Sequence, residues 1–158
     1  MKLLIKQGTV FDPKNAVAEE SRDLFVKDGF IVHSFKSPDQ ILDAKGFYVT
    51  PGAIDVGTCF ASPGMRLYGF KTGLANPGEI SACAARMGYT HIHEAMMFPT
   101  TALSAHEQLF SLPYQDTSAS LCLALRDFGA LVGSNAPPEQ TARFLATAAH
   151  HFKALNLR

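Results

Sequence analysis

Short apolar runs separated by turn residues fill the first 52 residues of the chain, and from residue 53 onward strand-like and helix-like runs alternate. In the first part, Asp28-Gly29 stands between two apolar runs. This predicts a β-hairpin, because glycine adopts the positive φ of a tight primed turn at low cost. Other strands are predicted to end at Gly8 and at Asp12-Pro13. The strands predicted for this small β module, residues 1–52, are residues 3–5, 10–11, 24–27, 30–35, 41–43 and 47–49.

Residues 53–158 predict an α/β layer of two or three parallel strands with helices outside. Apolar runs predict strands over 53–56 and 90–94, and apolar residues at helical spacing predict a helix over 79–87. The Gly- and Pro-rich stretch 62–78 between them predicts a long loop. The fold class we predict is therefore α/β: a small N-terminal β module followed by an incomplete TIM-like (β/α) barrel segment.

The second half of this layer has two helix-start signals. Ser104-Ala105-His106-Glu107 has the form of a capping box, which predicts a helix over about 106–111. Pro138 predicts the first turn of a final helix, with an apolar face formed by Phe144, Leu145, Ala148, Phe152 and Leu155. The run 121–125 fits either a helix or a strand, and 130–132 is a short apolar run.

Composition narrows the classes of partner. The 158 residues carry 14 basic and 14 acidic side chains, so the chain lacks the clustered positive charge that nucleic acids or anionic membranes attract. The apolar run at the start is too short for a signal peptide, and no later run reaches the length of a membrane span. We therefore expect a cytoplasmic protein with no nucleic acid and no membrane partner.

The three cysteines, Cys59, Cys83 and Cys122, are widely spaced and include no Cys-x-x-Cys pair. Such a set is typical of buried thiols in a reducing compartment rather than of a zinc or redox motif.

Several segments carry a family resemblance. LIKQGTVFDP at 4–13, VKDGFIV at 26–32, DAKG at 43–46 and TPGAID at 50–55 resemble the start of a cyclic amidohydrolase, as in dihydroorotases and hydantoinases. ARMGYT at 85–90, EAMMFP at 94–99 and AHEQL at 105–109 resemble the A subunit of formylmethanofuran dehydrogenase and of the related formyltransferase/hydrolase complex. The resemblance implies a β module, a (β/α)₈ barrel and a dinuclear zinc centre that acts on an N-formyl amide of methanofuran.

The chain departs from this pattern in two ways. Gly57 and Cys59 stand where the resemblance places the two imidazoles of a His-x-His motif, and a metal-activated water is the basis of hydrolysis in that superfamily. A full barrel also takes about 200–250 residues, more than residues 53–158 provide. We therefore expect a truncated, metal-deficient relative, in effect a pseudoenzyme, with no catalytic and no cofactor-binding residue.

His91 and His93 are the most metal-like pair, because alternate residues of a strand point to one face. With Cys59 they form the candidate ligand set of a rebuilt mononuclear site, although two same-face histidines also fit partly exposed polar positions. For Glu94 we prefer a role in holding neighbouring loops, with an acid/base role as the alternative. Asp55 is predicted to be a hydrogen-bond acceptor that anchors a loop.

Two histidine positions near helices have simpler explanations than ligand binding. His106 coincides with a histidine of the resembled family, but local helix structure accounts for it. His150 and His151 lie on adjacent helical faces and are predicted to be on the surface.

Three functions stay open. The first is a structural or regulatory partner in a one-carbon formyl-transfer complex, with a protein partner or as a homo-oligomer, because open strand edges invite pairing. The second is a metal-dependent amidohydrolase that acts on a C–N bond through the rebuilt site. The third is a dihydroorotase-like, non-catalytic assembly module.

Overall fold

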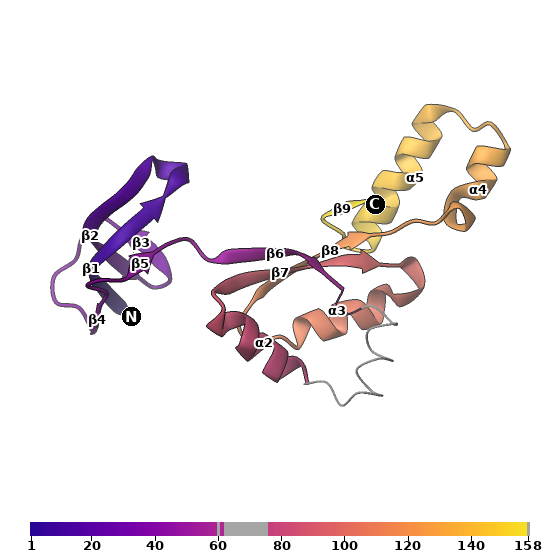
Figure 1. Ribbon diagram of the computed structural model, residues 1–158. Coiled ribbons are helices and arrows are strands. Elements are labelled where there is room, and N and C mark those ends of the chain that lie inside the picture. The colour runs from indigo at the N-terminus through magenta and orange to yellow at the C-terminus, as the bar shows by residue number, and fades with distance from the viewer. Residues whose placement is uncertain (60, 62–75, 158) are drawn as a thin grey trace. The chain divides into compact units, whose positions relative to one another are not determined.

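The computed structural model describes residues 1–59, 61 and 76–157, so most of the predicted loop over 62–78 lies outside the described residues. Contacts divide the chain into two compact units, Met1–Pro51 and Gly52–Arg158. The first is a small strand-rich module and the second a curled parallel half-barrel (Figure 1). The predicted fold class, a β module followed by an incomplete β/α barrel, is confirmed.

The first unit is a five-stranded sheet in the order β3-β2-β1-β4, with the short β5 also paired to β1. β1 and β2 run antiparallel, whereas β4 and β5 run parallel to β1. Its strands are β1 (Lys2–Asp12), β2 (Val17–Lys27), β3 (Phe30–Val32), β4 (Gln40–Asp43) and β5 (Tyr48–Val49), with a 3₁₀ turn at Pro13–Asn15.

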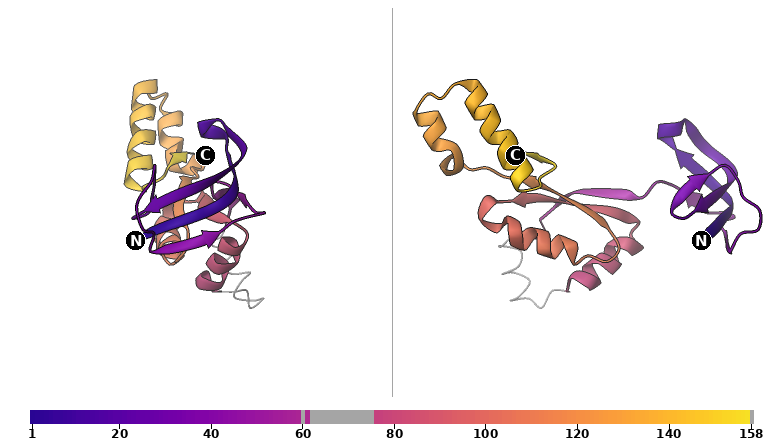
Figure 2. Two further views of the ribbon diagram at one scale, coloured as in Figure 1. Left: turned by 90° about the vertical axis from the view of Figure 1, so that its left-hand side faces the viewer. Right: turned by 180° about the vertical axis from the view of Figure 1, so that it is seen from behind.

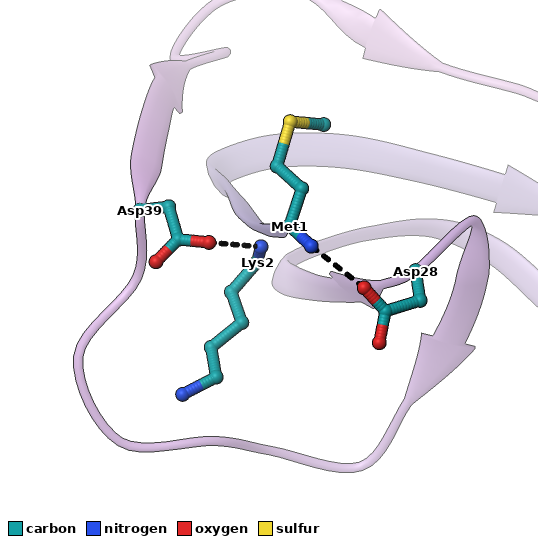
Figure 3. A network of polar contacts seen from close by, with 4 residues as sticks. All are labelled: Met1, Lys2, Asp28 and Asp39. Carbon is teal, nitrogen blue, oxygen red and sulfur yellow. Dashed lines mark hydrogen bonds and ion pairs between the residues drawn. The ribbon is translucent and has the colours of Figure 1, made fainter.

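The predicted hairpin at Asp28-Gly29 is confirmed. Lys27 pairs with Phe30, and the two turn residues have φ angles of 51° and 86°, as a two-residue primed turn requires. Asp28 also forms an ion pair with the amino group of Met1, at 2.6 Å. Figure 3 shows this contact beside a second one, in which the Lys2 amide donates to Asp39 at 2.7 Å.

The prediction that Gly8 ends a strand is wrong, because β1 continues through it. Gln7, just before it, has a left-handed φ of 59° at a register shift of the β1–β2 pair. The Gln7 amide donates to Asp23 at 2.9 Å. The glycine serves a close approach instead, since a Cβ at Gly8 would lie 2.5 Å from Cγ2 of Val49 on β5.

The hydrophobic pattern did not predict the first two-thirds of β2. Residues 18–23 of this strand are exposed, and none of them has a large apolar side chain that would mark a strand by alternation.

The second unit contains a parallel sheet in the order β6-β7-β8-β9. Four parallel strands are therefore present rather than the predicted two or three, although β9 has only two residues. Figures 1 and 2 show α2 and α3 along one face of β6, β7 and β8. The elements are β6 (Ala53–Thr58), α2 (Pro77–Arg86), β7 (Tyr89–Met97), a 3₁₀ turn (Pro99–Thr101), α3 (Ala102–Phe110), β8 (Asp116–Leu121), α4 (Leu125–Gly133), α5 (Pro138–His151) and β9 (Asn156–Leu157).

One contiguous apolar core lies between this sheet and its helices. Ile92 and Met97 of β7 and Leu121 of β8 are at most 4% exposed. They belong to one apolar cluster with Leu109 and several alanines of the helices. At the start of the unit, a Cβ at Gly52 would lie 2.1 Å from Oγ1 of Thr90 on β7. The backbone therefore approaches β7 as closely as a glycine permits.

The predicted helix starts were partly wrong. Ser104 does not cap α3; its hydroxyl donates to the carbonyl of Thr101 at 3.1 Å inside a helix that already began at Ala102. The preceding 3₁₀ turn starts this helix instead. α2 begins with a true capping box, in which Asn76 and Glu79 exchange two hydrogen bonds of 3.0 Å, a signal the sequence carried.

The remaining helix predictions were also mixed. Pro138 opens α5 as predicted, but Leu155 lies beyond the end of that helix and is exposed. The ambiguous run 121–125 divides between the end of β8 and the start of α4, which also contains the short apolar run 130–132. No helix in the described part of the chain is long and apolar enough to cross a membrane.

Candidate functional site on the inner face of the half-barrel

The strands of the half-barrel present a hollow of about 340 Å³ on the face turned away from α2 and α3. Ile54, Val56 and Leu155 supply its apolar walls. The polar lining comes from His91 and His93 on β7, Ser118 on β8 and Asn156 on β9.

His91 and His93 point to one face of β7, as predicted, and they converge on a hydroxyl group. His91 Nε2 and His93 Nδ1 each lie 2.7 Å from Ser118 Oγ. The other ring nitrogen of His93 lies 2.6 Å from Ser120 Oγ, and this hydroxyl donates to Asn156 Oδ1. Sequence analysis missed the two serines and the asparagine, although the spacing of Ser118 and Ser120 places them on one strand face.

This geometry does not favour the rebuilt metal site. Three of the four ring nitrogens of the pair already face a hydroxyl group at hydrogen-bond distance. Among residues 1–59, 61 and 76–157, no three His, Cys, Asp or Glu side chains gather closely enough to hold a metal ion.

The end of β6 is where the resemblance places the metal-binding imidazoles. Gly57 there offers no side chain, and a Cβ at this position would meet no atom within 4 Å. Cys59 is half-buried, and its thiol lies 4.0 Å from the Gly57 carbonyl. The Thr58 hydroxyl is buried without a hydrogen-bond partner among the described residues. These groups supply one thiol and no imidazole, so they do not fit a dinuclear zinc centre.

Glu94 holds the segment after β6, in partial agreement with its preferred interpretation, and its second partner lies in its own strand. Its fully buried carboxylate accepts the Ala61 amide at 2.7 Å and the Met96 amide at 2.9 Å. Burial raises the pKa of Glu94, and the two amide hydrogen bonds oppose that shift. The carboxylate thus fixes the segment after β6 against the end of β7.

The other candidate side chains have structural contacts. Asp55 accepts the Gly57 amide at 3.0 Å, so it is a hydrogen-bond acceptor as predicted, although the partner lies in its own strand, β6, and not in a loop. His106 Nε2 contacts the Phe152 carbonyl at 2.8 Å and so links α3 to the end of α5. His150 and His151 are at least partly exposed on α5.

The prediction of buried thiols is wrong for Cys83, which is exposed on α2. Cys59 and Cys122 are half-buried. The apolar spacing that placed Cys83 on the helix face with Ile80 and Ala84 did not reveal how narrow the buried stripe of α2 is, since Ser81 and Ala84 are its buried residues.

The parallel strands β6, β7 and β8, linked by helices and preceded by a small β module, define an amidohydrolase-like β/α architecture. The chain is 34% identical over 139 residues to Protein FwdA of Methanocaldococcus jannaschii, covering 75% of this chain and 24% of FwdA. It is 29% identical over 130 residues to the A subunit of the formyltransferase/hydrolase complex Fhc of Methylorubrum extorquens, covering 71% of this chain and 24% of that protein. The predicted resemblance to these proteins is confirmed.

A solved structure supports the same relationship. The formyltransferase/hydrolase complex of Methylorubrum extorquens, determined with methylofuran, contains a chain that matches with a TM-score of 0.71 and 27% identity. The match covers 78% of this chain and 26% of that one. A dihydroorotase of Pelotomaculum thermopropionicum is 44% identical over 68 residues, 40% of this chain and 16% of the enzyme. No family model matches the chain.

The chain thus spans about a quarter of the length of FwdA and of its Fhc counterpart.

Proposed function

We propose that this chain is a metal-deficient, non-hydrolytic relative of the A subunit of the formylmethanofuran dehydrogenase and formyltransferase/hydrolase complexes, with a structural or regulatory role. One observation carries the proposal: Gly57 at the end of β6 and Cys59 directly after it stand where the resemblance places a His-x-His motif. The 34% identity to FwdA supports the choice of subfamily.

The chemical argument rests on ligand number. A catalytic zinc ion takes three protein ligands and keeps one position for water, and that water is the nucleophile of metal-dependent hydrolysis. Near the end of β6 the ligand-type side chains of the described residues are the Cys59 thiol and the carboxylates of Asp55 and Glu94. Asp55 accepts the Gly57 amide, and both oxygens of Glu94 accept amide hydrogens. The described residues therefore do not activate a water molecule in this way.

Metal content and hydrolysis test this proposal. The chain, purified without a histidine tag, is expected to contain far less than one zinc or iron ion per molecule and to leave N-formyl amides intact. The double variant Gly57→His/Cys59→His is expected to stay inactive with added zinc, because two imidazoles are fewer than the three ligands required. Stoichiometric metal in the unmodified chain, or its hydrolysis of N-formyl amides, would overturn the proposal. Activity of the double variant alone would show that two restored imidazoles are enough and would contradict the ligand count only.

Gly57→Ala is the matched control for this variant. The position has no positive φ and no neighbouring atom within 4 Å of an added Cβ, so the alanine variant should unfold at the same denaturant concentration as the unmodified chain. A loss of stability in the double variant alone would then be due to the imidazoles.

The proposed role includes a protein partner in a one-carbon formyl-transfer complex. Ile54 and Val56 on β6 and Leu155 next to β9 are 60%, 65% and 72% exposed, although they line the inner face of a sheet that a closed barrel would cover. Contiguous apolar exposure of this kind marks interaction sites, and the similar solved chain comes from a multi-subunit complex.

Sedimentation and co-purification test the partner. We expect the chain to self-associate alone and to co-purify with the other subunits of a formyltransferase/hydrolase complex on co-expression. Val56→Asp is expected to weaken both associations, with the exposed Val132→Asp on α4 as the control. A monodisperse monomer that does not co-purify with these subunits would remove the reason to propose a partner.

A dihydroorotase-like, non-catalytic assembly module is the second candidate, and the 44% identity over 68 residues to a dihydroorotase favours it. Calorimetric titration with methylofuran and with dihydroorotate separates the two candidates. Heat of binding with methylofuran alone supports the formyl-transfer relationship, and binding of dihydroorotate alone supports the alternative.

A further inference from the structure

A second hollow of the half-barrel unit, of about 290 Å³, lies beside α5, and we call it the α5 hollow. Pro99 and Leu123, which follow β7 and β8, line it together with Phe144 on α5 and Phe152 directly after that helix. All four side chains are half-buried, so part of their apolar surface still faces water. A ligand that covered this surface would gain free energy from its burial.

The α5 hollow is separate from the inner face of the sheet. Leu123 and Phe152 pack against the core cluster between the sheet and its helices, and the two hollows have no lining residue in common. A volume of roughly 300 Å³ is the lower limit of common ligand pockets, which suits a molecule with a single ring or a short branched chain.

One carboxylate interrupts the apolar lining. Asp127 in the first turn of α4 lines the α5 hollow, and its side chain is only 19% exposed. Its Oδ2 accepts the Ala124 amide at 2.7 Å. Its Oδ1 has no hydrogen-bond donor among the described residues, because Nε of Arg126, at 3.9 Å, lies beyond hydrogen-bond distance. A largely shielded carboxylate oxygen is therefore left for a ligand.

We propose that the α5 hollow binds a small hydrophobic ammonium compound, with its charged nitrogen at Oδ1 of Asp127 and its apolar body against Phe144 and Phe152. A charge-assisted hydrogen bond between an ammonium group and a carboxylate is stronger than a bond between neutral groups. Because Asp127 is largely shielded from water, this attraction is screened less than it would be on an open surface. The aromatic side chains then select a ligand with an apolar body over a fully hydrated cation.

The other groups near Asp127 also favour a cation. His151, which lines the hollow, is the last residue of α5, and the partial negative charge at the C-terminal end of a helix attracts cations. Thr147 adds a hydroxyl group to the lining. Arg126 opposes a second positive charge, but its side chain is 72% exposed, where its charge is screened by solvent.

Titration of the full chain with three ligands of similar shape tests the preference for charge. The ligands are cyclohexylammonium, cyclohexanol and cyclohexanecarboxylate, and the measurement is the NMR shift of backbone amides, with the largest shifts expected at Leu123, Asp127 and Phe152. Cyclohexylammonium should bind about tenfold more tightly than cyclohexanol, because one charge-assisted hydrogen bond distinguishes them. Cyclohexanecarboxylate should bind most weakly.

Three variants test the role of the carboxylate. Asp127→Asn removes the charge but keeps an oxygen for the Ala124 amide, so it should lower the affinity for cyclohexylammonium about tenfold and leave that for cyclohexanol unchanged. Arg126→Gln should raise the affinity for cyclohexylammonium, because it removes a competing positive charge. Glu139→Gln is the matched control, since Glu139 is an exposed carboxylate on α5 outside the lining.

Several results would overturn the proposal. They are no binding of cyclohexylammonium, equal affinity for the three ligands, or an affinity for cyclohexylammonium that Asp127→Asn leaves unchanged. Should the asparagine variant fail to fold, Thr147→Phe decides instead. Thr147 is exposed, so a phenyl ring there should fill the hollow without disturbing the core and should prevent binding of cyclohexylammonium and cyclohexanol. Unchanged binding in this variant would show that the ligand binds elsewhere.

Discussion

The half-barrel sheet rests on a contiguous apolar core of side chains from β7, β8 and their helices. The N-terminal unit, in contrast, has three buried apolar side chains, Val10, Val17 and Ala44. In the N-terminal unit, Phe30 and Ile31 are more than 70% exposed. The long β1–β2 ladder and the turn residues therefore determine that unit more than packing does. The comparison predicts that substitutions of core side chains strongly lower the stability of the half-barrel. The stability of the N-terminal unit should depend mainly on residues that set its backbone conformation.

The largest expected effect is the loss of a core side chain. Leu109 on α3 is 2% exposed, so Leu109→Ala should lower the free energy of unfolding by about 2–5 kcal/mol. Leu103→Ala on the same helix is the matched control, because Leu103 is 77% exposed and its loss should change stability by at most about 0.5 kcal/mol. Urea denaturation measures both. Equal losses would contradict the core as described.

Removal of the buried carboxylate comes next. The two oxygens of Glu94 each accept one backbone amide, whereas a glutamine side chain has one acceptor oxygen. Glu94→Gln would therefore leave one amide unpaired and should lower the free energy of unfolding by about 1–3 kcal/mol at pH 7. Because burial raises the pKa of Glu94, the folded state binds the proton more tightly than the unfolded state. The stability of the unmodified chain relative to the variant should therefore rise as the pH falls from 7 towards 4.5. A pH-independent difference would contradict this.

A turn residue tests the N-terminal unit. Gly29 has a φ of 86°, so Gly29→Ala should destabilise the β2–β3 hairpin by about 1 kcal/mol or slightly more. Gly129→Ala is the opposite case. That glycine lies inside α4 at a helical φ, and the added Cβ meets Leu125 at an ordinary 3.9 Å, so a gain of about 0.5–1 kcal/mol is expected. Hydrogen exchange of the two segments should change in opposite directions.

The smallest expected effect is at Asp28. Its hydrogen bond and ion pair with the amino terminus lower the pKa of this exposed carboxyl group. The stabilisation is therefore present above the ordinary value of 3.8 and is lost as the pH falls through the lower folded pKa, the opposite of Glu94. Asp28→Asn should abolish this acid-range loss and leave stability near pH 7 almost unchanged. NMR titration of the Asp28 carboxyl group measures the shift directly.

The sequence predicted those elements whose signal is local. The Asp28-Gly29 turn and the start of α5 at Pro138 follow from the φ preferences of single residues. The prediction of a strand end at Gly8 was wrong because a glycine allows another strand to approach closely as readily as it allows a turn. Ser104 misled because the preceding Pro99–Thr101 turn had already started the helix.

The candidate site was predictable only in part. Strand alternation placed His91 and His93 on one face, but nothing in their own segment indicated the partners. The hydrogen bonds that join His93 to Ser118 and Ser120, and Ser120 to Asn156, each span 25 to 36 residues of sequence. The parallel register of β7, β8 and β9 brings these side chains together, and register between strands is a property of the folded sheet.

The close approach of Gly52 to Thr90 bears on how the chain should be dissected in the laboratory. The boundary between the two units falls at Pro51 and Gly52. A protease site or tag sequence that takes the place of Gly52 would put a Cβ 2.1 Å from Thr90 Oγ1. Expression of the half-barrel alone should therefore start before Pro51 and keep Gly52 unchanged. The separation point that the sequence makes most obvious is thus the one that least tolerates an added side chain.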